Sequence, residues 1–158
     1  MKKNFVFYAC SLAVVLVLAG FAACEEESDT LKPSIELIEP AEGEVLLIGA
    51  DVHFEMALSD NEQLGSYKIE IHPNFDGHDH DTKAEAETEP FYFERSWDVS
   101  GKKNTSVHHH EIVIPENATP GDYHLIVYCA DAAGNESHIA LNIELSHEGE
   151  HIGHDHDD

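Results

Sequence analysis

Clustered histidines are the residues of this chain whose type and spacing could do chemistry. The chain holds 13 His among 158 residues, with 32 Asp and Glu against only 8 Lys and Arg. Neutral imidazole is a good ligand for zinc and copper, and nearby carboxylates can ligate as well or orient the rings. The composition therefore predicts a bound zinc or copper ion, and the net charge of −24 disfavours nucleic acid as a partner.

The first candidate metal site is the loop that follows His72. Its sequence, HPNFDGHDHD, sets His78 and His80 two residues apart beside a flexible Gly, so both rings can turn toward one ion. His124 is expected beside His72, because the two strands that carry them are neighbours in an immunoglobulin-like sandwich. The same ordering places His53 at this end of the domain. The alternative is a hydrated acidic loop whose His only keep the protein soluble.

The second candidate site is His108-His109-His110. In a strand, His108 and His110 share one face and can form a two-His chelate, while His109 takes the other face. The alternation that buries Ile112 and Ile114 predicts that His108 and His110 also point inward. They are then either packed, hydrogen-bonded core residues or ligands in a pocket. Simple topology places them toward the end opposite His72 and His124, and a shifted or bent strand would be needed to form one site with His124.

Two further segments carry possible ligands. The tail, residues 147–158, is rich in His and Asp and resembles a disordered metal-scavenging tract, although a solubilising end is equally consistent with it. Calcium is the competing ion, because the acidic segments 60–62 and 131–136 lie in loops predicted at one end of the domain. Calcium takes oxygen ligands and does not explain the histidines, so we expect it less than zinc or copper.

The part of the chain that positions these residues is predicted to contain only β-strands. Short alternating runs are separated by Gly, Pro, Asn and Asp, and no long helical period is present. Seven strands in one immunoglobulin-like β-sandwich are predicted, over residues 34–39, 51–59, 64–72, 91–98, 106–114, 122–130 and 137–145. The buried faces follow from alternation, and Trp97 with residues 91–93 is expected to add aromatic bulk. Cys129 falls on a buried face and is expected to be a structural thiol.

The first residues read as a lipoprotein signal peptide. Lys2 and Lys3 precede an apolar run that ends in Ala22-Ala23-Cys24, which resembles a lipobox with Cys24 as the lipidated residue. An uncleaved membrane anchor is the alternative. The predicted domains are a signal peptide over 1–23, a lipidated acidic tether over 24–32, a sandwich over 33–146 and a disordered tail over 147–158.

Several segments together resemble a known family. Residues 112–136 are similar to the end of bacterial immunoglobulin-like domains, which implies that Tyr123 is a corner tyrosine. The whole chain after the signal resembles a family of Bacteroidota lipoproteins catalogued as domain of unknown function 4625, through residues 71–72, 77–80, 108–115, 121–124 and 131–135. With residues 25–29, which resemble an export signal, this implies an outer-membrane lipoprotein exposed at the cell surface. A solvated acidic tether would equally suit a lipoprotein that faces the periplasm.

The expected function is therefore binding of zinc or copper for storage, sensing or delivery. Its partners are the metal ion, the outer membrane through the lipid, and an outer-membrane transporter or other surface protein. No enzyme is expected, because no nucleophile elbow, zinc-protease motif, phosphate-binding loop or reactive Cys is present. The alternative is a non-catalytic adhesive or structural module.

Overall fold

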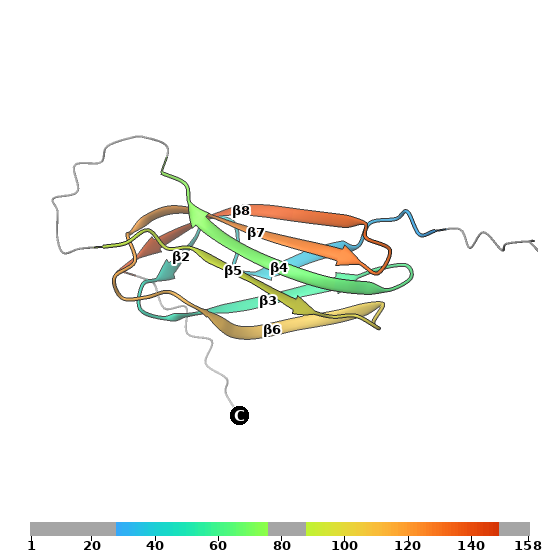
Figure 1. Cartoon of the computed structure of the whole chain (residues 1–158). Coiled ribbons are helices and arrows are strands. Elements are labelled where there is room, and N and C mark those ends of the chain that lie inside the picture. Colours follow the sequence, from blue (N-terminus) through green and yellow to red (C-terminus); the bar gives the residue numbers. More distant parts are fainter. Residues whose placement is uncertain (1–27, 76–87, 149–158) are drawn as a thin grey trace, which may run out of the picture.

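Two facing sheets make up the part of the chain that the computed structural model describes, residues 28–75 and 88–148. A three-stranded sheet has the order β1-β3-β6, and a five-stranded sheet has the order β2-β8-β7-β4-β5 (Figure 1). The strands are β1 Ser34–Glu39, β2 Glu44–Leu47, β3 Asp51–Ser59, β4 Leu64–Pro73, β5 Phe93–Asp98, β6 Asn104–Val113, β7 Gly121–Asp131 and β8 Glu136–Ser146. The predicted all-β sandwich is confirmed.

Alternation fixes the buried faces, as the sequence predicts. Each central strand turns every second side chain into the space between the sheets, and the largest fully buried side chains include Phe54, Met56, Ile69, Tyr123 and Leu125. The strand that ends at His72 and the strand that begins before His124 are neighbours, because β4 pairs antiparallel with β7. None of the described residues forms a helix long and apolar enough to cross a membrane.

The strand count differs from the prediction. The described residues form eight strands, and seven were predicted. The extra strand is β2, a run of four residues that pairs in parallel with β8 at the edge of the larger sheet. So short a run shows too little alternation to be recognised in the sequence. The fourth predicted strand also begins at Phe93 and not at residue 91, and Tyr92 is 69% exposed, so it adds nothing to the core.

Tyr123 is the corner tyrosine that the resemblance implies. Its side chain is fully buried, and its hydroxyl donates to the carbonyl oxygen of Thr119 at 2.7 Å and accepts from the Phe91 backbone N–H at 3.2 Å. Burial raises the pKa of this phenol. The hydroxyl therefore links the segment before β5 to the segment before β7.

Aromatic stacking closes one open side of the sandwich, between edge strands β5 and β6. Trp97 of β5 stacks on His109 of β6 with ring centroids 4.9 Å apart, and His109 in turn stacks on Phe54. The Trp97 indole N–H donates to Glu111 at 3.1 Å, and Glu111 also forms an ion pair with Arg95 at 2.6 Å. These contacts join the two sheets without a connecting strand.

Candidate metal centre

Three histidines converge on the outer face of the three-stranded sheet. His53 of β3 lies beside His108 and His110 of β6, and one ring nitrogen from each lies within 4.8 Å of the others. The ring centroid of His53 is 4.7 Å from that of His108 and 5.0 Å from that of His110. All three side chains are exposed, so an ion can reach them from solvent. We call these residues the three-histidine cluster.

A β-bulge in β6 builds the cluster. Val52 pairs with Ile112 and Phe54 pairs with His109, so two residues of β6, His110 and Glu111, stand opposite the single residue His53. The extra residue reverses the alternation of the strand at this point. Val107 is buried before the bulge and Ile112 after it, and His108 and His110 are thereby left on the outer face with His53.

Carboxylates surround the three imidazoles. Asp51, two residues before His53 on the same face of β3, places Oδ2 2.7 Å from Nδ1 of His110. Oxygens of Glu39 and Glu55 lie 3.6 and 3.9 Å from Nε2 of His53. A carboxylate on one ring nitrogen fixes the ring and favours ligation through the other nitrogen. Asp51 therefore orients His110 and leaves its Nε2 available to an ion.

A second bulge brings Glu39 to this face. Leu37 pairs with Met56 but Glu39 pairs with Glu55, so the register of β1 shifts at Ile38. Ile38 is 48% exposed as a result, and Glu39 joins the outer face near His53. Two bulges on the flanking strands therefore direct ligand-type side chains toward the central strand of the sheet.

The donor set suits zinc or copper. Three imidazole nitrogens leave one position of a tetrahedral zinc site for a carboxylate or water, and imidazole also suits copper. Because a zinc–nitrogen bond is about 2.0–2.1 Å long, nitrogens within 4.8 Å of one another need only small side-chain rotations to share an ion.

His72 and His124 also lie together, as predicted. They are direct cross-strand partners in β4 and β7, and their ring centroids are 5.5 Å apart in an edge-to-face arrangement. Both are half-buried on the outer face of the five-stranded sheet. His78 and His80 lie outside the described residues, so the loop part of this predicted site stays a prediction, as does lipidation at Cys24.

One expectation for the histidines is wrong. His108 and His110 face outward and His109 faces inward, because the bulge reverses the alternation that was extrapolated from Ile112. These residues do not join His124, because the two groups lie on the outer faces of different sheets with the core between them. His53 lies at the same end of the domain as His72, as predicted, because β3 begins where β4 ends (Figure 1), but it belongs to the smaller sheet and lies beside His108 and His110.

Asp51 was not predicted from the sequence as part of a site, and His53 was predicted only to lie at the same end of the domain as His72. Asp51, His53 and Glu55 alternate with the buried Val52 and Phe54, so their shared outward face was visible in the sequence. The sequence did not indicate that the strand carrying His108 and His110 pairs with the strand carrying Asp51 and His53.

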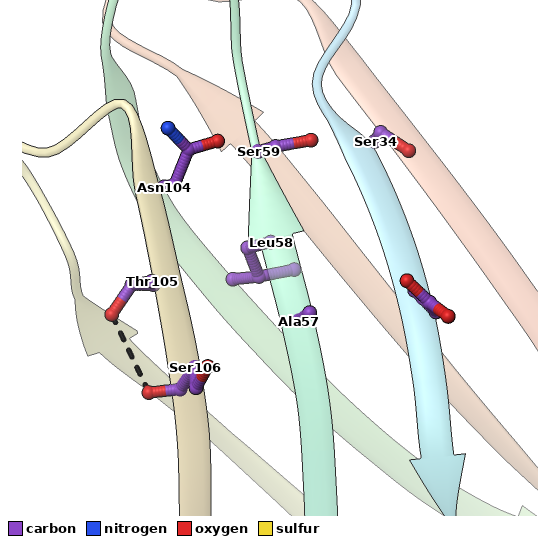
Figure 2. A pocket seen from close by; sticks show the side chains of 8 residues that line it. Ser34, Ala57, Leu58, Ser59, Asn104, Thr105 and Ser106 are labelled. Atoms are coloured by element: carbon purple, nitrogen blue, oxygen red, sulfur yellow. Dashed lines mark hydrogen bonds between the residues drawn. The ribbon is translucent and has the colours of Figure 1, made fainter.

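A shallow hollow of about 400 Å³ lies further along the same outer face. Figure 2 shows it lined by short side chains of β1, β3 and β6, with Ser34, Ser59 and Asn104 at its upper end. Glu36 is its only charged residue, so the chemistry of this face is concentrated in the three-histidine cluster.

Comparisons with known proteins place the chain in a family. The strand order defines an immunoglobulin-like β-sandwich. The chain belongs to the family described as Domain of unknown function (DUF4625), whose model matches residues 21–146. It is also similar to the crystal structure of a DUF4466 family protein from Parabacteroides merdae ATCC 43184, at 13% identity and a TM-score of 0.39. That match covers 75% of this chain but only 46% of the other, so the chain spans less than half of that protein's length. No curated protein matches the chain significantly.

Proposed function

We propose that this protein binds a transition-metal ion, zinc first and copper second, at the three-histidine cluster. The observation that carries the proposal is the convergence of three exposed imidazoles from two strands within 4.8 Å, with the Asp51 carboxylate 2.7 Å from one of them. Structural histidines are usually buried and hydrogen-bonded, whereas these are exposed and accessible to solvent. An accessible site of this kind suits storage, sensing or delivery of the ion, and no catalytic role is proposed.

The proposed setting is the outer membrane. In this proposal Cys24 carries the lipid, the acidic segment after it forms a tether, and the sandwich faces the cell surface. A transporter or another surface protein receives or supplies the ion. His72, His124 and the His-rich tail then raise the local metal concentration near the three-histidine cluster.

The test is a zinc and copper titration of the full-length chain in detergent, read by heat release and stoichiometry. Replacement of His147, His151, His154 and His156 by Ala first removes the imidazole ligands of the tail. In that background we expect about one submicromolar zinc site. The variant with His53, His108 and His110 replaced by Ala loses this site, and the fold is checked by circular dichroism.

The matched control changes His72 and His124 to Ala, because they are also a cross-strand imidazole pair but lie on the other sheet. We expect the tight site to survive in that control. Loss of the site in the control and not in the cluster variant would move the metal to the other face. Zinc binding that is weak in every form would instead support the adhesive or structural module, with His serving only solubility.

A further inference from the structure

Three aspartates meet at the end of the sandwich opposite the three-histidine cluster. Asp29 precedes β1, Asp60 lies in the turn between β3 and β4, and Asp131 ends β7. One carboxylate oxygen from each lies within 4.8 Å of the others. In Figure 1 the chain before β1 runs beside the β3–β4 and β7–β8 turns at this end. We call these residues the three-aspartate cluster.

Hydrogen bonds hold each carboxylate in place. Oδ1 of Asp60 accepts from the backbone N–H groups of Glu62 and Gln63 at 2.8 and 2.7 Å. Oδ1 of Asp29 accepts from the Leu31 N–H at 3.0 Å. Both oxygens of Asp131 accept from Asn135, whose side-chain amide also donates to the carbonyl oxygen of Asp29. The cluster is therefore fixed in position by its surroundings.

The second oxygens of two carboxylates have no hydrogen-bond partner within residues 28–75 and 88–148. The side chains of Asp29 and Asp60 are half-buried, but their Oδ2 atoms are buried, and neither atom accepts a hydrogen bond from the described residues. A buried carboxylate oxygen without a partner is strongly unfavourable, because it loses its hydration and gains nothing in return. These two oxygens therefore indicate a cation at the cluster, independently of how close the three carboxylates are.

No side chain supplies that cation within the part of the chain that the structure describes. Lys and Arg form ion pairs only with Glu70 and Glu111 there, and the ammonium of Lys103 donates to the Asn61 carbonyl instead.

The Asp131 carboxylate carries a negative charge although its side chain is only 5% exposed. Burial raises its pKa, but hydrogen bonds from Asn135 and the following turn outweigh that effect and lower it, so the group is ionised at neutral pH. The cluster gathers negative charge that no Lys or Arg of the described segments neutralises.

We infer that the three-aspartate cluster is a calcium site. Calcium takes six to eight oxygen ligands at about 2.3–2.6 Å, so carboxylate oxygens that lie within 4.8 Å of one another can share one ion. Zinc and copper favour the imidazole cluster at the other end, and magnesium demands a stricter octahedron. Backbone carbonyls and waters complete the coordination.

Calcium at this position fastens the segment before β1 to the sandwich. Asp29 is the only one of the three aspartates outside the strands and their connecting turns, and the amide of Asn135 already reaches its backbone. The ion therefore stiffens the connection between the sandwich and the preceding tether. This site is independent of the proposed transition-metal site, because the two clusters share no residue and lie at opposite ends of the fold.

The experiment is thermal unfolding of the full-length chain in detergent with calcium chloride or with EGTA. With a dissociation constant of about 0.1–1 mM, as in extracellular calcium modules, 5 mM calcium should raise the Tm by about 5 °C. Magnesium should raise it less. Hydrogen exchange at the Leu31 amide should slow with calcium, because that amide is hydrogen-bonded to Asp29.

The variants are Asp29→Asn and Asp60→Asn, which keep an oxygen to accept the backbone hydrogen bonds but remove charge. Both should abolish the calcium-dependent shift. The matched control is Asp98→Asn, because Asp98 accepts from the Ser100 N–H just as Asp60 accepts from Glu62, but away from the cluster. This control and the Ala variant of the three-histidine cluster should keep the full shift. An unchanged Tm in 10 mM calcium would overturn the inference. So would a calcium-dependent rise in Tm that persists in both Asn variants.

Discussion

His53 and His108 face each other across β3 and β6 with ring centroids 4.7 Å apart, on the solvent side of the smaller sheet. Neighbouring strands readily bring two side chains this close. The bulge that turns His110 to the same face adds the third imidazole, and this makes the pair a candidate chelate.

Protons should compete with zinc for this cluster. Ligation requires neutral imidazole, so each ligand that is protonated must lose its proton before the ion binds. We expect zinc affinity to fall at least tenfold between pH 7.5 and pH 5.5, measured by competition with a chelator of known affinity. A flat profile would show that the ligands are not imidazoles.

Asp51→Asn should weaken zinc binding without removing the site. The substitution replaces the carboxylate beside Nδ1 of His110, and loss of such an orienting partner lowers metal affinity by about 10- to 100-fold. Titration of the full-length chain with zinc, read by heat release, measures the affinity. The control is Asp122→Asn, an exposed aspartate of β7 in the other sheet, which should leave the affinity unchanged.

Tyr123→Phe should lower the free energy of unfolding by about 1–3 kcal/mol. The variant keeps the buried ring but leaves the Thr119 carbonyl and the Phe91 N–H without their partner. Urea denaturation measures the loss. Tyr92→Phe is the matched control, because that ring is 69% exposed and should give no change.

His109→Phe should increase stability, most clearly in mild acid. The Nε2 atom of His109 is buried without a partner between Phe54 and Trp97, and Phe keeps the stack without that atom. Burial lowers the pKa of His109, and Arg95 with the adjacent imidazoles adds to this effect while Glu111 opposes it.

Since the folded pKa lies below the unfolded value, His109 destabilises the fold as pH falls through the unfolded pKa toward the folded one. The Phe variant should therefore lose less stability between pH 7 and pH 5 than the parent in urea denaturation. His138→Phe, at an exposed position, should leave this pH dependence as it is. An equal acid loss in parent and His109→Phe would contradict the assignment.

The Cys129 thiol should resist modification in the folded protein. Its side chain is fully buried, and burial raises its pKa to about 11, so little thiolate forms at pH 8. In a chain with Cys10 and Cys24 changed to Ser, a thiol reagent should react slowly until urea unfolds the protein. Rapid reaction without urea would show that β7 opens locally.

The sequence by itself determined the sandwich and much of its interior. Strict alternation in β3, β4, β7 and β8 assigns the buried faces, because a strand turns successive side chains to opposite sides. The same alternation, with the neighbouring order of β4 and β7, was enough to place His72 beside His124. Tyr123 followed from the resemblance to immunoglobulin-like domains and has the hydrogen bond of a corner tyrosine.

Only the tertiary structure decided where the ligand-type side chains meet. The bulge changes the parity of the buried positions between Val107 and Ile112, so the outward position of His108 and His110 could not be extrapolated from Ile112. Asp29, Asp60 and Asp131 come from three separate segments, and folding alone brings them together. Alternation is a local property of a strand, whereas register and the meeting of turns depend on how whole strands pair.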